Sequence, residues 1–203
     1  MKDNLLFWPT FCIFAKTLIL MRKKMIVIHP NDGTTSFLNV LYKDKENITK
    51  IDETWRRRDI LKAIGESDKS EIIMMLGHGS EHGLYAPSSG SQFGKLIVDH
   101  KMHDLLQGRT CIGIWCNAID FAKRFDLSGL FTGMIISEEE EAVMEGVDIY
   151  GEDLNLCNKQ FALDLDYCIR HHPLYEIPSK MLELQDYHSD LKDFNYNNIF
   201  TNK

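Results

Sequence analysis

The sequence predicts an α/β fold with a mostly parallel sheet and helices on both of its faces. Three short apolar runs, each bounded by turn residues, occur at Met25–His29, Glu71–Leu76 and Thr110–Trp115. Runs of this length and composition are typical of parallel strands that are buried on both faces. Amphipathic helical patterns separate the runs, and strands that alternate with helices favour parallel pairing between two helical layers.

The composition indicates one domain, which we assign to residues 21–203. The full chain has 203 residues, of which 44% are hydrophobic, so it is long enough to bury a core. The net charge of −7 argues against a nucleic-acid partner, because such binding depends on neutralising phosphates. The five cysteines are an odd number without regular spacing, which favours reduced thiols in a cytoplasmic protein.

Residues 1–20 form an atypical apolar segment, and its interpretation stays open. Pro9 and Lys16 interrupt it, and it is short for a spanning helix, which needs roughly 20 residues. It also lacks a strong basic start and a small-residue cleavage site before Met21. It is an over-extended start ahead of Met21, a membrane anchor or secretory signal, or an element that packs on the domain. Only a genuine signal or anchor would change the cytoplasmic assignment.

The remaining elements follow from turn, cap and period signals. In the first half, we expect a turn at 30–33, a short helix capped by Thr34 or Thr35 and ending at Leu41, a polar connection or weak edge strand at 42–54, and a helix from Trp55 to Gly65. In the second half, we expect a loop or hairpin at 83–94, then an extended piece and a helix closed by Gly108, a helix at 121–125 and a strand at 129–137. A capping box of Ser137 and Glu140 should follow this strand. The last elements are a helix at 152–170 with Leu156, Phe161, Leu165 and Cys168 facing inward, a helix at 178–194, and frayed last residues.

Two chemically active side chains stand directly after neighbouring apolar runs. His78 lies between Gly77 and Gly79, and Cys116 follows the run that ends at Trp115. Ligands of open α/β sheets bind beyond the carboxyl ends of the strands, so these side chains could meet at one edge. A nearby base converts a thiol into a nucleophile, and the N–H groups of Gly79 and Cys116 could stabilise an oxyanion. The pattern predicts a Cys-His dyad.

The arrangement resembles the caspase-like cysteine peptidases, a group that includes caspases, gingipain-type peptidases and CHAT domains. The stretch LIVDHKMHDLLQGRTCIGIWCNA looks most like a CHAT domain, and GLFTGMIISEEEEA resembles the strand and helix that follow there. The resemblance covers residues 70–145, although Trp115 replaces the alanine of the caspase glutamine-alanine-cysteine signature. It implies a caspase-like three-layer sandwich and an endopeptidase that acts on a peptide or protein without a cofactor. His78 would be the general base and Cys116 the nucleophile.

Polar residues near the dyad are candidates for substrate binding. They are Ser80, Asn117 and Glu138. The acidic run that begins at Glu138 could bind a basic side chain, but a solvated helix start explains it equally well. No metal site is expected: the glycines around His78 and His82 rule out a helix that would present both rings, and His100 and His103 lack a clear third ligand.

Other functions remain open at this point. Cysteine is among the most buried residue types, so Cys116 could be a structural residue at a strand end. A catalytically inactive caspase-like module could bind a partner through the same cleft and act as a regulatory domain. A third alternative is another α/β hydrolase-type or regulatory domain in which the cysteine is incidental. The sequence does not predict the oligomeric state.

Overall fold

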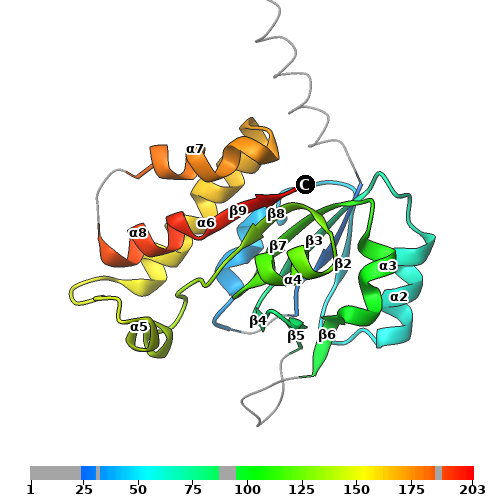
Figure 1. Ribbon diagram of the computed structural model, residues 1–203, viewed down its shortest axis with the longest axis horizontal. Helices are drawn as coiled ribbons and strands as arrows, with labels where there is room; N and C mark the ends of the chain where they lie inside the picture. The colour runs from blue at the N-terminus through cyan, green and yellow to red at the C-terminus, as the bar shows by residue number, and fades with distance from the viewer. Residues whose placement is uncertain (1–23, 31–32, 87–94, 186–188) are drawn as a thin grey trace, which may run out of the picture.

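The structure is a computed structural model that describes residues 24–30, 33–86, 95–185 and 189–203. Within these ranges the main sheet has six strands in the order β2-β1-β3-β7-β8-β9 (Figure 1). All neighbouring strands are parallel except β8 and β9, which are antiparallel. The predicted fold class is therefore confirmed. The strands are β1 (Met25–Ile28), β2 (Ile48–Ile51), β3 (Ile72–Leu76), β7 (Thr110–Ile114), β8 (Ser128–Thr132) and β9 (Ile199–Asn202).

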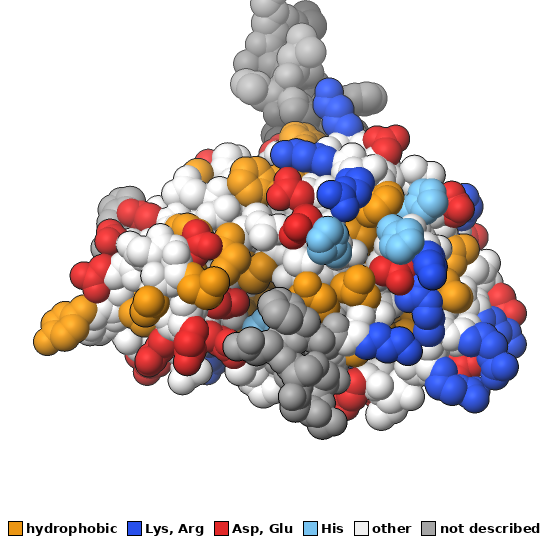
Figure 2. All heavy atoms as spheres, turned by 60° about the horizontal axis from the view of Figure 1, so that its bottom comes forward, with side chains coloured by type: hydrophobic (Ala, Val, Ile, Leu, Met, Phe, Trp, Pro, Cys, Tyr) orange, Lys and Arg blue, Asp and Glu red, His pale blue; other side chains and the backbone are white. Residues whose placement is uncertain are grey.

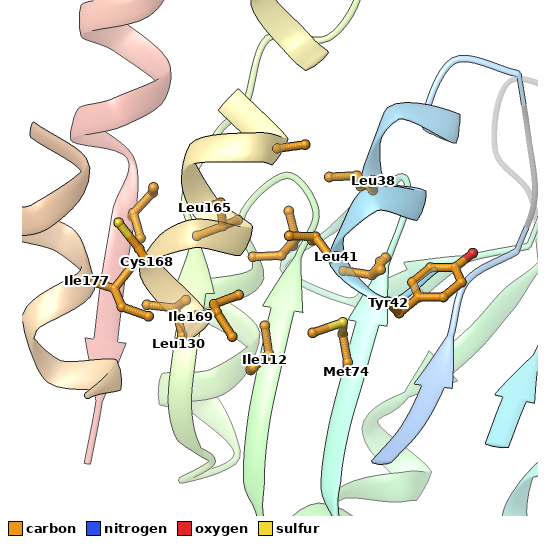
Figure 3. Close-up of a cluster of buried hydrophobic side chains, with 14 of the residues drawn as sticks. Leu38, Leu41, Tyr42, Met74, Ile112, Leu130, Leu165, Cys168, Ile169 and Ile177 are labelled. Atoms are coloured by element: carbon orange, nitrogen blue, oxygen red, sulfur yellow. The ribbon is translucent and has the colours of Figure 1, made fainter. Parts of the chain in front are cut away.

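Helices cover both faces of this sheet, in agreement with a three-layer sandwich. Because side chains alternate along a strand, Met74 packs in one layer and Met75 in the other. Figure 3 shows the first layer, where Leu41, Ile112 and Leu165 come together from η1, β7 and α6. This layer contains η1 (Ser36–Leu41), α6 (Leu154–His171), η3 (Leu174–Glu176), α7 (Ile177–Glu183) and α8 (Asp190–Asn197). The second contains α2 (Arg57–Glu66), η2 (His100–Met102), α3 (His103–Leu106) and α4 (Ala118–Arg124).

A small antiparallel sheet follows β3 and lies at the carboxyl edge of the main sheet (Figure 1). It pairs β4 (Gly79–Ser80), β5 (Gly83–Tyr85) and β6 (Leu96–Asp99), where a loop or hairpin and an extended piece were predicted. Gly83 has φ +135°, and a Cβ built there would lie 2.0 Å from the Val98 carbonyl oxygen. Only glycine allows this approach, so Gly83 fixes the pairing of β5 with β6.

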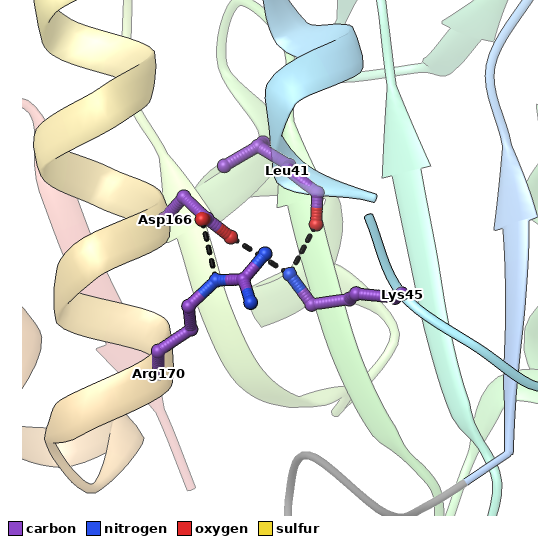
Figure 4. Close-up of polar contacts among 4 residues, drawn as sticks. All are labelled: Leu41, Lys45, Asp166 and Arg170. Carbon is purple, nitrogen blue, oxygen red and sulfur yellow. Dashed lines mark hydrogen bonds and ion pairs between the residues drawn. The ribbon is translucent and has the colours of Figure 1, made fainter. Parts of the chain in front are cut away.

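An ionic cluster fixes η1 against α6 (Figure 4). Lys45 Nζ lies 2.7 Å from Asp166 Oδ1, and Arg170 Nε lies 2.5 Å from Asp166 Oδ2. Lys45 also donates a hydrogen bond to the carbonyl oxygen of Leu41, the last residue of η1. Burial lowers the pKa of Lys45, and the contact with Asp166 opposes that effect. The cluster matters for function because η1 forms one wall of the cavity described below.

The helix predicted to end at Gly65 is present as α2, which ends one residue later, at Glu66. The buried guanidinium of Arg109, which follows α3 in the sequence, contacts the end of this helix. It donates hydrogen bonds to the carbonyl oxygens of Ile64 (2.9 Å), Ser67 (3.2 Å) and Asp68 (2.7 Å). These bonds hold the end of α2 and the turn after it against the segment that leads into β7. The edge strand suggested within residues 42–54 is confirmed as β2.

Two predictions for the C-terminal part were wrong. The single helix predicted at 178–194 is replaced by the separate helices α7 and α8; residues 186–188 between them lie outside the described ranges. The last residues do not fray but form β9, which pairs with β8. Ile199 is buried, and the Asn202 side chain donates a hydrogen bond to Leu127 O at 2.8 Å. The strand has only 4 residues and ends in Thr201 and Asn202, so its sequence carries little strand signal.

The capping box of the acidic segment and one side chain of α6 differ from their predicted positions. The capping box of α5 (Glu139–Glu145) is formed by Glu138 and Glu141, one position later than the predicted Ser137 and Glu140. Leu156 is 62% exposed, although its helical position predicted an inward side chain. The other predicted inward residues of α6 are buried as expected: Phe161, Leu165 and Cys168.

No helix in the described ranges combines the length and apolar character needed to cross a membrane. Residues 1–20, with their alternative interpretations, lie outside these ranges. The same holds for Cys12, while the other four cysteines carry free thiols: Cys111, Cys116, Cys157 and Cys168.

Candidate active site

The candidate site lies where β3 and β7 end. These strands are direct parallel neighbours, and Leu76 aligns with Ile114. The residues that follow them, His78 and Cys116, line one small cavity with a volume of about 20 Å³, room for roughly one water molecule. The remaining lining residues come from several separate segments of the chain: Thr35, Phe37, Leu38, Gly77, Ile114, Trp115, Ile135, Ser137 and Phe161.

His78 is held by its backbone and by its ring. Gly77, at φ +137°, donates its N–H to Ile114 O at 3.1 Å, which links the ends of the two strands. The carbonyl oxygen of His78 accepts a hydrogen bond from Tyr85 N–H at 2.8 Å. Its Nε2 lies 2.7 Å from the hydroxyl oxygen of Thr34. If Nε2 carries the proton, the hydroxyl oxygen of Thr34 accepts the hydrogen bond, and the basic nitrogen of the ring is Nδ1.

The thiol of Cys116 is partly buried and contacts two oxygen acceptors. Its Sγ lies 3.4 Å from Ile135 O and 3.8 Å from Glu141 Oε1. Burial, and then the negative charge of Glu141, raise the pKa of Cys116 to about 12. Both effects disfavour the charged thiolate. The thiol is therefore protonated at neutral pH in this state.

The backbone at Cys116 turns sharply from β7 into α4. Trp115 N–H donates to Thr132 Oγ1 at 3.1 Å, and Asn117 N–H donates to Gly133 O at 2.9 Å. Asn117 has φ +65°, a left-handed conformation that asparagine tolerates. The N–H of Cys116 lies between these two donors, at the turn where the sequence predicts a donor to a substrate oxyanion.

Trp115 explains why glycine is needed at two positions near the site. A Cβ on Gly79 would lie 2.1 Å from Trp115 Cδ1, and one on Gly113 would lie 2.7 Å from Trp115 Cζ3. The indole of Trp115 fills the space that a side chain on Gly79 would occupy. The indole N–H donates to Ser80 O at 3.0 Å. Trp115 therefore joins the two loops that carry His78 and Cys116.

The predicted substrate-binding residues make local structural contacts. Ser80 Oγ accepts a hydrogen bond from Tyr85 OH at 2.8 Å. Asn117 is the N-cap residue before α4, where its side chain makes no capping hydrogen bond, and the side chain of Glu138 caps the first turn of α5. These contacts do not test whether a substrate touches the three side chains, so their binding role stays a prediction.

Sequence reasoning missed the contacts that matter most at the site. Thr34 was considered only as a helix cap, and Glu141 only as part of an acidic run. His29, directly after β1, is fully buried, and its ring nitrogens lie 3.0 Å from Tyr42 OH and 3.3 Å from Thr35 Oγ1. The position of His29 after an apolar strand was a usable signal. Thr34 and Glu141 gave none, because each meets its partner only through the fold.

The described ranges contain no cluster of three or more His, Cys, Asp and Glu side chains that could hold a metal ion. Two of the four histidines weighed as metal ligands have acidic neighbours: His82 Nε2 lies 3.3 Å from Glu81 Oε1, and His103 Nε2 lies 3.0 Å from Asp104 Oδ1. Comparison of the chain with models of known protein families and with curated proteins gave no match.

Proposed function

We propose that this protein is a caspase-like cysteine endopeptidase that uses Cys116 as nucleophile and His78 as general base. The observation that carries the proposal is that these side chains line one cavity at the ends of adjacent parallel strands. Carboxyl ends of parallel strands are the usual place for ligand sites in open α/β sheets. The cavity holds little more than a water molecule, so a peptide would lie across its mouth.

The proposed reaction is acyl transfer from a peptide bond to the thiol. His78 takes the proton of Cys116, and the thiolate attacks the peptide carbonyl carbon. Because Thr34 holds Nε2, the proposal assigns the base role to Nδ1. The N–H groups of Cys116 and Gly79 would stabilise the oxyanion. Collapse of this intermediate breaks the C–N bond, His78 returns the proton to the leaving amine, and water hydrolyses the thioester.

We infer a peptide or protein substrate, no nucleic-acid partner and a cytoplasmic location. The four free cysteines of the described ranges support a reducing compartment. The net charge of −7 supports a partner other than nucleic acid.

Activity towards a mixed peptide library tests this proposal. The variant Cys116→Ala should abolish cleavage, and His78→Ala should reduce it by roughly 100- to 10,000-fold, the usual contribution of a general base. Cys157→Ala is the matched control, since Cys157 is another partly buried cysteine but lies on α6. If Cys116→Ala still cleaves peptides, Cys116 is not the nucleophile.

One observation favours a second candidate function, an inactive caspase-like module that binds a partner through the same cleft. The raised pKa of Cys116, about 12, and its contact with Glu141 are unfavourable for a nucleophile. An inactive module predicts no selective labelling of Cys116 by acyloxymethyl-ketone probes. A peptidase predicts labelling of Cys116 that is lost in His78→Ala.

A further inference from the structure

The helix α5 is attached to the domain by few contacts. Ala142 is its one buried residue within the described structure, while Val143 and Met144 are 80% and 82% exposed. Figure 2 shows hydrophobic and acidic side chains gathered on the side of the molecule where α5 lies. A helix of seven residues is too short to be stable without packing. This segment therefore belongs to the low-stability part of the fold, which opens most easily.

The carboxylate of Glu141 connects this helix to the candidate nucleophile. One oxygen, Oε2, accepts hydrogen bonds from Ser137 N (2.7 Å), Ser137 Oγ (3.0 Å) and Glu138 N (3.2 Å). The other oxygen, Oε1, accepts from the Cys116 thiol at 3.8 Å. Glu141 holds the start of α5 and restrains the thiol through the same group. Opening of the capping box therefore frees this carboxylate to leave Cys116.

A second observation lies on the other side of Ser137. Asn158 on α6 is 4% exposed, and its Nδ2 donates to Ser137 O at 3.0 Å. Its Oδ1 is buried and has no hydrogen-bond partner among the described residues. Asn158 therefore links the segment before α5 to α6 while one of its own buried acceptors stays unsatisfied, which is unfavourable in the closed arrangement.

We propose that α5 is a gate that controls the reactivity of Cys116. In the closed state, which the structure describes, Glu141 lies against the thiol. In the open state the Glu138–Glu141 capping box is released, the carboxylate withdraws, and the thiol can transfer its proton to His78. The gate regulates the proposed active site, so its biological meaning rests on the proposed function. The reactivity of the Cys116 thiol can be measured without a substrate, so the gate can be tested separately from peptidase activity.

The test is the rate of alkylation of Cys116 by iodoacetamide near neutral pH, with the modified residue identified by peptide mass spectrometry. Glu141→Gln removes the charge and keeps one acceptor, and we expect its rate constant to rise by about tenfold, the effect of one pKa unit on the thiolate fraction. Glu138→Ala weakens the capping box and keeps Glu141. We expect it to accelerate both alkylation and amide hydrogen exchange at the start of α5. Glu145→Gln, on the same helix, is the control and should react like the wild type.

Circular dichroism of each variant confirms that it is folded. Equal alkylation rates in Glu141→Gln and wild type would overturn the proposal. Faster hydrogen exchange in Glu138→Ala without faster alkylation would also overturn it, because opening of the capping box would then leave the contact between Glu141 and Cys116 unchanged. An equal increase in Glu145→Gln would assign the effect to net charge and also reject the gate. If the rates change as expected while no variant cleaves any peptide, the gate stands and the peptidase proposal fails.

Discussion

The indole N–H of Trp115 donates a hydrogen bond to the carbonyl oxygen of Ser80 at 3.0 Å, so the residue before Cys116 holds the hairpin after His78. The Trp115 ring is buried, and it packs edge-on against Phe121 at a centroid distance of 5.8 Å. The relative position of the two proposed catalytic residues thus depends on a side chain that has no chemical role itself.

Trp115→Phe keeps most of the buried area and removes this hydrogen bond. We expect the free energy of unfolding to fall by about 1 kcal/mol, the usual net value of such a bond. Gly79→Ala should destabilise more, because its Cβ would lie 2.1 Å from the indole. Urea denaturation measures both effects. Gly65→Ala is the control, since its Cβ would meet only Leu105 Cδ2 at 3.8 Å and should stabilise α2 by about 0.5–1 kcal/mol.

Thr34→Val removes the hydroxyl that lies 2.7 Å from His78 Nε2 while keeping a similar side-chain shape. In the proposed peptidase this change should lower kcat by roughly tenfold, because the imidazole loses its orientation and its preferred tautomer. The pH profile of kcat should also shift, whereas KM should change little. Thr34→Ser, which keeps the hydroxyl, should restore most of the activity. A Thr34→Val enzyme with an unchanged rate and pH profile would show that Thr34 does not position His78.

Asp166→Asn should destabilise the protein by about 2 kcal/mol, because it leaves two largely buried cations without a carboxylate. Lys45 and Arg170 both bond to Asp166, and the three side chains are only 9–22% exposed. Glu183→Gln, which breaks the exposed pair with Lys180, should cause no measurable loss. Thermal unfolding of both variants makes the comparison. Equal melting temperatures would mean that the Lys45–Asp166–Arg170 cluster does not stabilise the η1–α6 contact.

The buried thiols predict a loss of stability in alkaline solution. The pKa values of Cys111, Cys116 and Cys168 are each raised to about 12, mainly by burial. Because the unfolded thiols ionise first, the unfolded state binds fewer protons between about pH 8.5 and pH 12. The stability is complete below that window and falls as pH rises through it, by up to about 1.4 kcal/mol per pH unit and thiol. Urea denaturation at several pH values should show a smaller slope in Cys168→Ala than in the wild type.

The sequence predicted the elements whose signals are local. Apolar runs identified β1, β3 and β7, and their parallel order placed His78 and Cys116 at one edge. Long-range contacts were not predictable in this way. Arg109 holds the end of α2 by bonding to carbonyl groups more than 40 residues earlier in the chain. Glu141 reaches Cys116 only because the segment after β8 returns to the end of β7.

The contrast between local signals and long-range contacts matters most for the chemistry of Cys116. Residue types and spacing suggested a nucleophile and a base, but the ionisation of a thiol depends on every charge and dipole around it. Burial first, and then the carboxylate of Glu141 from α5, make the described state of Cys116 unfavourable for attack. Neither the acidic run nor the apolar strand contains that information by itself.

The antiparallel pair of β8 and β9 has a consequence during synthesis. Leu130 pairs with Thr201, so β8 keeps an unpaired edge until about 70 more residues have been translated. At about 5–20 residues per second, a nascent chain exposes this edge for several seconds. An unpaired apolar strand is a template for association with other chains. Chaperone binding to stalled ribosomal complexes should therefore be strongest for chains that end between β8 and β9.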